Sequence, residues 1–296
     1  MTAEIVAGAF DDVSVVLVNY NSRAVIGQCL EQLRAAREIV IVDNASSDDS
    51  VAYIEANFPN ARVIRNRHNV GFGCGINECV QHITNPYFLI VSPDVTIDAA
   101  TVAALRTDLV RYPDAACIVP ILKAPRDSLQ TWVMGPGEFQ QRNETLDAGG
   151  PFCTWFVTCA AIVFRTDAFR AIDGFDSNIF LYQEDLDLCL RIRRAGHSMI
   201  IAPHLVAGHI NSGSAPPSRQ LSWRKEWNFA WGTYYVIHKH VSARAARIAA
   251  LKCIARRGPK ALFYALIRDK KRLLRDFAWT HGALSFLLGR LPVRPR

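Results

Sequence analysis

Short apolar runs rich in β-branched residues alternate with helical patterns along the first third of the chain, and this alternation limits the folds open to it. Val13–Val18 reads VSVVLV, which is typical of a strand buried on both faces. Similar runs predict strands at Ile39–Val42, Arg62–Arg65 and Tyr87–Val91. Helices are expected over residues 25–36, 50–57 and 101–111, with another ending near residue 82. This β-α alternation predicts an α/β fold with a mainly parallel sheet flanked by helices.

The second half of the chain is less regular. Residues 117–165 mix strand-like runs with loops, and a helix is expected over Glu184–Ala195, ended by Gly196. A strand follows at Met199–Ala202, and a long helix covers about Ser218–His240. Basic helical segments continue to the end of the chain. The sequence therefore predicts an α/β body followed by a helical extension.

The composition fits a globular chain without a membrane-spanning segment. Half of the 296 residues are hydrophobic, enough for one large domain with an appendage. No apolar run reaches the roughly 20 residues of a transmembrane helix, and the first residues, MTAEIVAGAFDD, do not resemble a signal peptide. The eight cysteines form no C-x-x-C motif and lie mostly among apolar neighbours, as buried free thiols do. We therefore expect a cytoplasmic protein.

The net charge of +7 conceals two parts of opposite sign. Residues 236–296 carry 15 Lys or Arg and 2 Asp or Glu, a net +13, which leaves −6 on residues 1–235. A basic amphipathic tail of this kind is typical of a segment attracted to an anionic membrane surface. A solvated basic face is the alternative. Nucleic acid is not expected as a partner, because no recognition motif accompanies the charge.

Polar side chains follow three of the predicted strands at the points where the strands end. These are Asn19–Asn21, Asp43-Asn44 and Asp94. Ligands of open α/β sheets bind outside the carboxyl ends of the strands, so the three sites together indicate a ligand crevice, although Asp and Asn also form ordinary turns. Asp94 suits a hard divalent cation that substrate phosphates also hold. His209, on a later loop, is either a further ligand or structural.

Two more segments leave alternatives open. The run Asn69–Asn77 (NVGFGCGIN) lacks the G-x-G-x-x-G spacing of a dinucleotide fingerprint, so its glycines permit either a close approach to a ligand or a tight helix entry. Glu184-Asp185 opens the segment EDLDLCLR. An acid at a helix start is stabilised by the free N–H groups, and one that faces a cleft can take a proton from a substrate hydroxyl.

Together these segments resemble the family 2 glycosyltransferases with the GT-A fold, most closely their bacterial rhamnosyltransferase-like branch. The resemblance covers about residues 13–215 and implies a catalytic domain over residues 11–235. Its nucleotide-sugar half would be about 11–115 and its acceptor half about 116–235, before a helical tail over 236–296. The motifs that carry it are VVLVNYNS (15–22), VDNASSDDS (42–50), NVGFGCGIN (69–77), SPDV (92–95), GFDSNIFLYQEDLDLCLR (174–191) and the loop from His209 to Ser214.

The resemblance also implies roles for single residues. Asp94 is similar to the metal-binding acid of a motif that usually reads Asn-Pro-Asp, with Ser92 here in place of the Asn. His209 is similar to a second metal or diphosphate contact, and the implied cofactor is Mg²⁺ or Mn²⁺. Asp185 matches the catalytic base, and Glu184 is expected beside it at the acceptor. The implied nucleotide-sugar contacts are Asn19, Tyr20, Asn21, Asp43, Asn69, Gly71, Phe72, Asn77 and Asp94.

The implied reaction is an inverting transfer of one sugar, rhamnose from dTDP-rhamnose, to a glycan or lipid-linked glycan in bacterial surface polysaccharide synthesis. It needs a base on the acceptor hydroxyl and a metal-stabilised diphosphate on the opposite face of the sugar. The expected location is peripheral, on the inner face of the cell membrane. The alternatives are a nucleotidyltransferase on a related sheet and an inactive membrane-associated nucleotide- or glycan-binding protein.

An aromatic stripe marks the long helix near residues 218–240. Trp223, Trp227 and Trp231 recur at a spacing of four residues, which places them along one side of the helix. The stripe is expected to pack against the catalytic domain, with an acceptor groove or a lipid interface as the alternatives.

Overall fold

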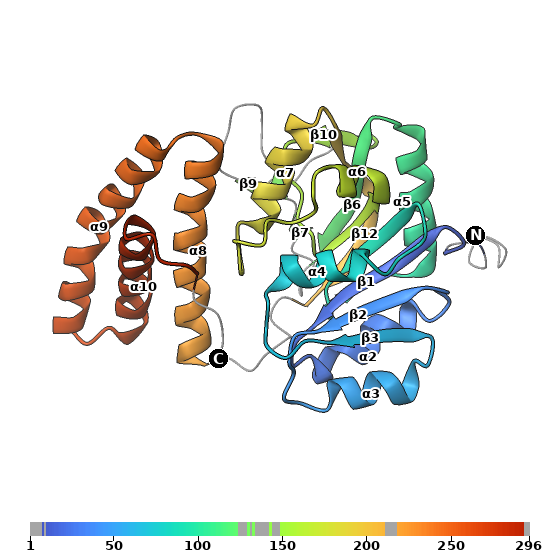
Figure 1. The fold of residues 1–296 in the computed structure, drawn as a ribbon, viewed down its shortest axis with the longest axis horizontal. Coiled ribbons are helices and arrows are strands. Elements are labelled where there is room, and N and C mark those ends of the chain that lie inside the picture. The colour runs from blue at the N-terminus through green and yellow to red at the C-terminus, as the bar shows by residue number, and fades with distance from the viewer. Residues whose placement is uncertain are drawn as a thin grey trace.

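A mixed sheet with helices on both faces forms the larger part of the molecule, and a bundle of three helices lies against one side of it (Figure 1). The computed structural model describes residues 8, 10–123, 129–130, 132–133, 142–143, 149–210 and 218–292. Within these residues ten strands form one sheet. They are β1 (Val13–Asn19), β2 (Ile39–Asp43), β3 (Ala61–Arg65), β4 (Tyr87–Val91), β5 (Val95–Thr96), β6 (Ala115–Lys123), β7 (Leu129–Gln130), β10 (Phe152–Thr154), β11 (Ala161–Arg165) and β12 (Ser198–His209).

The sheet order is β10-β12-β6-β11-β4-β1-β2-β3, with β5 beside β12 and β7 beside β6. The four strands from β3 to β4 are parallel, as the alternation predicts. β11 runs antiparallel to both of its neighbours, so the whole sheet is mixed. A separate pair is formed by β8 (Trp132–Val133) and β9 (Arg142–Asn143).

Two hydrophobic cores, one on each face, hold the helices to the sheet because successive strand residues point to opposite faces. α2 (Arg23–Gln32), α3 (Ser50–Asn57) and α5 (Ala99–Arg111) cover one face, where Leu17 and Ile41 are fully buried. α4 (Phe72–Val80), α6 (Thr166–Ala171) and α7 (Glu184–Arg194) cover the other, which includes Val18 and Val42. The α/β fold predicted from the sequence is confirmed.

The C-terminal bundle consists of α8 (Arg219–His240), α9 (Ala243–Leu266) and α10 (Lys270–Leu287). The hydroxyl or carboxylate of an N-cap residue, Ser218, Ser242 or Asp269, accepts a backbone hydrogen bond at each helix start. None of the helices within the described ranges is both long and apolar enough to cross a bilayer.

The aromatic stripe of α8 packs inside this bundle, whereas the sequence predicted packing against the catalytic domain. Trp227 and Trp231 are buried. The indole N–H of Trp227 donates to Nδ1 of His281 at 2.7 Å, and that of Trp231 donates to the carbonyl of Arg290 at 2.8 Å. The physical reason is that α10 folds back along α8 and supplies both the apolar surface and the acceptors that buried indoles need.

A buried charge cluster joins the end of α8 to α7. Asp187 binds Arg191, Lys239 and His240 at 2.7 to 2.8 Å. Burial alone would raise the pKa of Asp187, but the hydrogen bond from His240 and the charge of Arg191 lower it to about 2. Lys239 also binds Asp176, at 2.6 Å. Because α8 continues through residue 235, the division of the chain there stays a prediction.

Candidate active site

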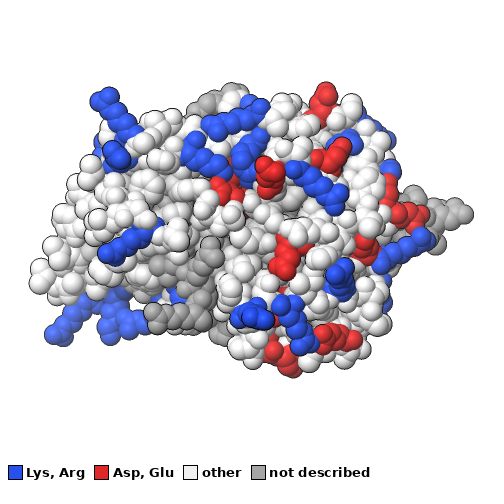
Figure 2. Space-filling view, viewed as in Figure 1, with Lys and Arg blue, Asp and Glu red and all other residues white. Residues whose placement is uncertain are grey.

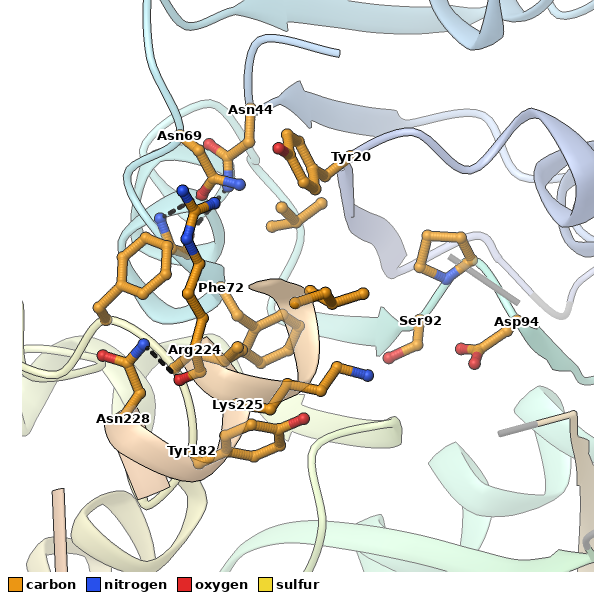
Figure 3. A pocket seen from close by; sticks show the side chains of 16 residues that line it. Tyr20, Asn44, Asn69, Phe72, Ser92, Asp94, Tyr182, Arg224, Lys225 and Asn228 are labelled. Carbon is orange, nitrogen blue, oxygen red and sulfur yellow. Dashed lines mark hydrogen bonds between the residues drawn. The ribbon is translucent and has the colours of Figure 1, made fainter. Parts of the chain in front are cut away.

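A cavity of about 300 Å³ opens where β1, β2 and β4 end (Figure 3). Its wall combines residues that follow these strands with the entry of α4, the segment before α7 and one side of α8. This is the crevice expected at the carboxyl ends of parallel strands. The predicted nucleotide-binding residues that line it are Tyr20, Asn69, Gly71, Phe72 and Asp94.

Asn19 and Asp43 lie behind the lining and fix the ends of β1 and β2 to one another. Asn19 is fully buried, and its amide donates to Oδ1 of Asp43 at 2.7 Å and to Ser50 at 2.8 Å. Asp43 in turn accepts the backbone N–H of Ser46 at 3.1 Å. Asn21 accepts the backbone N–H of Ser47 at 2.7 Å. These contacts shape the floor of the cavity, so the role of these three residues as direct nucleotide contacts stays a prediction.

The glycine-rich segment meets the loop before α7. Gly71 has a φ of +94°, and a Cβ there would lie 2.2 Å from the carbonyl oxygen of Phe180. Asn69 accepts the backbone N–H of Gly71 at 2.9 Å. Asn77 lies outside the cavity lining and binds both backbone groups of Phe175 at 2.8 Å. The sequence predicted that Gly71 permits either a close approach to a ligand or a tight helix entry. In the structure Gly71 allows the carbonyl of Phe180 to approach closely, and it also lines the cavity.

Asp94 and His209 meet although 115 positions separate them in the chain. β12 ends at His209 and pairs with β5, which leaves Nε2 of His209 3.7 Å from Oδ1 of Asp94. Burial lowers the pKa of His209, against the opposing charge of Asp94, and this favours the neutral imidazole that binds metals. Nδ1 of His209 is buried without a hydrogen-bond partner in the described structure.

The Asp94–His209 pair fits a hard divalent cation that takes its remaining ligands from substrate phosphates and water. Within the described residues, no group of three His, Cys, Asp or Glu side chains forms a complete protein site. The rest of the predicted loop after His209, residues 211–214, lies outside the described residues.

Glu184 and Asp185 open α7 immediately beyond the cavity wall. Tyr182, which lines the cavity, and Gln183 both have positive φ, +65° and +71°, and this left-handed turn leads into the helix. Glu184 is buried and Asp185 is partly exposed. Neither carboxyl is part of the cavity lining.

The two carboxyl groups differ in pKa. Burial and the neighbouring Asp185 charge raise the pKa of Glu184 to about 8. Burial raises that of Asp185 to about 6, with hydrogen bonds from Cys159 acting in the opposite direction. Because the rise is larger at Glu184, the pair favours a proton on Glu184 and the negative charge on Asp185 near neutral pH. Two adjacent carboxyls in different protonation states are the arrangement that acid-base chemistry uses.

The wall from α8 was missed by sequence reasoning. Leu221, Arg224, Lys225 and Asn228 line the cavity from this helix. In Figure 3 the guanidinium of Arg224 extends toward Asn69, and the amine of Lys225 lies on the side of the cavity that holds Ser92 and Asp94. The four residues follow an i, i+3, i+4, i+7 spacing, a signal that was present beside the more conspicuous tryptophans.

Comparison with known proteins identifies the class. Residues 14–172 match the family model described as Glycosyl transferase family 2. The chain belongs to this family and is a glycosyltransferase, which excludes the nucleotidyltransferase alternative.

Two curated relatives with named activities are similar to the chain. The chain is 23% identical over 228 residues to an N-acetylglucosaminyl-diphospho-decaprenol L-rhamnosyltransferase of Mycobacterium tuberculosis, covering 65% of this chain and 74% of the relative. It is 21% identical over 216 residues to the low-salt glycan biosynthesis hexosyltransferase Agl10 of Haloferax volcanii, covering 65% of each chain. The rhamnosyltransferase-like resemblance is thus confirmed at the level of a distant relative.

Solved structures confirm the GT-A fold. The mannosyltransferase PcManGT of Pyrobaculum calidifontis, in complex with GDP-Man and Mn²⁺, has a TM-score of 0.58 at 17% identity and covers 94% of this chain and 87% of its own. TarS 1-349 of S. aureus in complex with UDP-GlcNAc has a TM-score of 0.56 at 13% identity, covering 94% and 92%.

Proposed function

We propose that the protein transfers rhamnose, with inversion, from dTDP-rhamnose to a lipid-linked glycan in bacterial surface polysaccharide synthesis. One observation carries this proposal. Asp94, which follows β4, and the segment that leads into α7 line the same cavity. Such a wall supports one site that holds a donor diphosphate and an acceptor hydroxyl together. The choice of sugar and acceptor is supported by the named rhamnosyltransferase relative.

Asp185 is the base in this proposal. It accepts the proton of the acceptor hydroxyl, whose oxygen forms the new bond to the anomeric carbon while the bond to the diphosphate breaks. The pKa of about 6 leaves Asp185 ionised at neutral pH yet more basic than an exposed aspartate. Glu184, with its pKa of about 8, keeps its proton and so adds no second negative charge beside the base.

Asp94 and His209 are the proposed ligands of Mg²⁺ or Mn²⁺. The lowered pKa of His209 and its 3.7 Å approach to Asp94 support this assignment. A bound divalent cation supplies charge neutralisation to the departing diphosphate.

The nucleotide is proposed to occupy the part of the cavity between Tyr20 and Asn69, which the β1 end and the α4 entry form. The diphosphate would then extend from the Asn69 end of the cavity, where the guanidinium of Arg224 lies, to the part near Lys225 and Asp94. Cationic side chains stabilise phosphate groups by charge-assisted hydrogen bonds.

The basic tail is proposed to hold the enzyme peripherally on the inner face of the cell membrane. The net +13 of residues 236–296 supports attraction to anionic lipid. A lipid-linked acceptor would then be met in the plane of the membrane.

A panel of nucleotide sugars tests the proposal. The thermal transition is measured for the whole protein with dTDP-, UDP- and GDP-sugars, each with Mg²⁺, Mn²⁺ or a chelator. We expect the largest stabilisation from dTDP-rhamnose, and only with a divalent cation, because a ligand that binds the folded state raises its stability. Equal responses to all donors, or a response that the chelator leaves unchanged, would contradict the donor or the metal assignment respectively.

A further inference from the structure

The outward face of α9 carries an apolar stripe. Ile248, Leu251, Ala255, Leu262 and Leu266 follow one another at intervals of three, four or seven residues, which places them on one side of the helix. The exposed fractions of the four larger side chains are 43%, 57%, 72% and 82% in chain order. The buried residues of α9 lie on the opposite side of the helix, and they are Ala246, Ala250 and Ala261.

Helix α9 is thus apolar on two opposite sides, and only one side is packed. Its inner side contacts α8 and α10. It is also the outermost helix of the bundle, whereas α8 faces the α/β body (Figure 1). A helix at the surface of a water-soluble bundle normally carries polar side chains on its outer side. Apolar side chains as exposed as these indicate a binding surface.

Cations flank the stripe. Lys252, Arg256 and Lys260 follow at intervals of four along one edge, and Arg247 lies on the other edge. The 24 residues of α9 include six Arg or Lys and no Asp or Glu. Figure 2 shows Lys and Arg, without Asp or Glu, on the visible surface of α9. Of the other two cations, Arg244 is exposed in the first turn, and Arg257 pairs with Asp276 of α10 at 2.5 Å.

This combination favours lipid over protein as the occupant. Apolar side chains can enter the boundary between headgroups and acyl chains, while Lys and Arg at the edges reach the anionic phosphates. A second copy of the chain fits less well, because two α9 faces in contact would bring the flanking cations of one copy against those of the other, and neither helix carries an acid.

We propose that the outward face of α9 lies flat on an anionic lipid surface. This inference rests on the lipid-linked acceptor of the proposed function and names the surface that docks. Leu262 and Leu266 enter the lipid boundary, and the flanking cations bind the headgroups. The apolar surface continues at the end of the helix through Phe263 and Ile267, which are 55% and 52% exposed.

Docking through α9 also orients the catalytic cavity. α8 packs on α9 and supplies the cavity wall at Arg224 and Lys225. The lipid surface is therefore separated from the donor site by α9 and α8. A lipid-linked acceptor would approach from the side of the bundle.

Vesicle binding by the full chain tests this surface directly. Protein is sedimented with vesicles of phosphatidylcholine alone and with vesicles containing about one third phosphatidylglycerol, at low and moderate salt. We expect binding to the anionic vesicles that weakens with salt. Leu262→Glu, and separately the pair Lys252→Glu with Arg256→Glu, should each reduce the bound fraction by about tenfold or more.

Matched substitutions on the α/β body serve as controls. Val110 of α5 is 43% exposed, and Arg62 of β3 is exposed, so Val110→Glu and Arg62→Glu make one apolar-to-acidic change and one charge reversal away from α9. Both should bind vesicles as the unaltered protein does. All variants should keep the donor-induced thermal shift, which separates loss of docking from misfolding and from failure of the proposed function.

Three outcomes would overturn the inference. The first is that the unaltered protein fails to bind anionic vesicles. The second is that Leu262→Glu binds them as well as the unaltered protein does. Alternatively, sedimentation velocity finds a dimer that Leu262→Glu dissociates, which would make the stripe an interface between two copies of the chain.

Discussion

Gly71 illustrates at the scale of one residue how closely the cavity wall is packed. Its backbone has a φ of +94°, and a Cβ would lie 2.2 Å from the Phe180 carbonyl. Gly71→Ala should therefore cost about 2 kcal/mol or more, since backbone strain and a steric clash add together. We expect a lower melting temperature and weaker donor binding. Gly258→Ala in α9, where the added Cβ would lie 3.9 Å from the methyl group of Thr280, should be neutral or stabilising. Equal effects of the two substitutions would contradict this account of Gly71.

The buried carboxyl of Glu184 should make stability depend on pH. Its pKa of about 8 in the folded protein exceeds the ordinary value of 4.5. Between these values the unfolded chain releases a proton that the folded chain keeps, so stability falls as pH rises through this window and levels off above pH 8. Glu184→Gln removes this dependence. Its melting temperature relative to the unaltered protein should increase from pH 5 to pH 8, and a constant difference would refute the raised pKa.

The sequence predicted some features of the candidate site residues and not others. Asp94 and His209 were predicted as contacts of the same metal from two separate motifs, and the β5–β12 pairing that brings them together has no signal in either motif. Asn19 and Asp43 were predicted to contact the nucleotide. Their side chains form a hydrogen bond to one another behind the cavity lining, and their contact with the nucleotide stays a prediction. Local patterns predict which strand end carries a polar residue. They do not predict whether its side chain forms hydrogen bonds to a neighbouring loop or remains available to a ligand.

At the scale of elements, the parallel strands and their helices were predictable because the burial of both sheet faces leaves a continuous apolar pattern. The predicted range 50–57 agrees with α3, and Tyr87–Val91 agrees with β4. β12 extends to His209, well beyond the predicted Met199–Ala202. Its later part follows a register shift and is mostly partly or fully exposed, so it lacks the continuous apolar pattern of the first part. α8 was predicted as a helix, but its place at the cavity depends on contacts between distant segments.

The α8 wall leads to a prediction for two cations. Arg224→Ala and Lys225→Ala should each weaken binding of a nucleoside diphosphate by about tenfold, or ~1.4 kcal/mol, because each removes a charge-assisted contact to phosphate. Binding of the corresponding nucleoside should not change. Calorimetric titration with the nucleoside, monophosphate and diphosphate measures this difference.

Arg219→Ala provides the control for these cations, because Arg219 is exposed at the start of the same helix and does not line the cavity. It should leave all three affinities unchanged. If Arg224→Ala and Lys225→Ala weaken nucleoside and diphosphate binding equally, the two cations support the fold of the wall and do not contact phosphate.

At the scale of the whole molecule, both ends of α8 join the C-terminal bundle to the candidate active site and its neighbouring helix α7. The first turns of α8 line the cavity, and its last residues, Lys239 and His240, hold Asp187 in the helix that begins with Glu184 and Asp185. The sequence indicated a basic tail with its own charge and left its relation to the catalytic part open. That relation arises because α10 and α9 pack on α8. The helical region thus lines the candidate site through α8 and carries the exposed apolar stripe on α9.

The measurement that tests the central claim most directly compares Asp185→Asn with the unaltered enzyme. Transfer from the donor selected by the panel to a lipid-linked glycan is followed by mass spectrometry, and donor affinity is measured in parallel. A base acts mainly in the transition state, so turnover should fall by about 10²- to 10⁴-fold while donor affinity stays unchanged. Near-normal turnover in Asp185→Asn would contradict the assignment of Asp185 as the base of this glycosyltransferase.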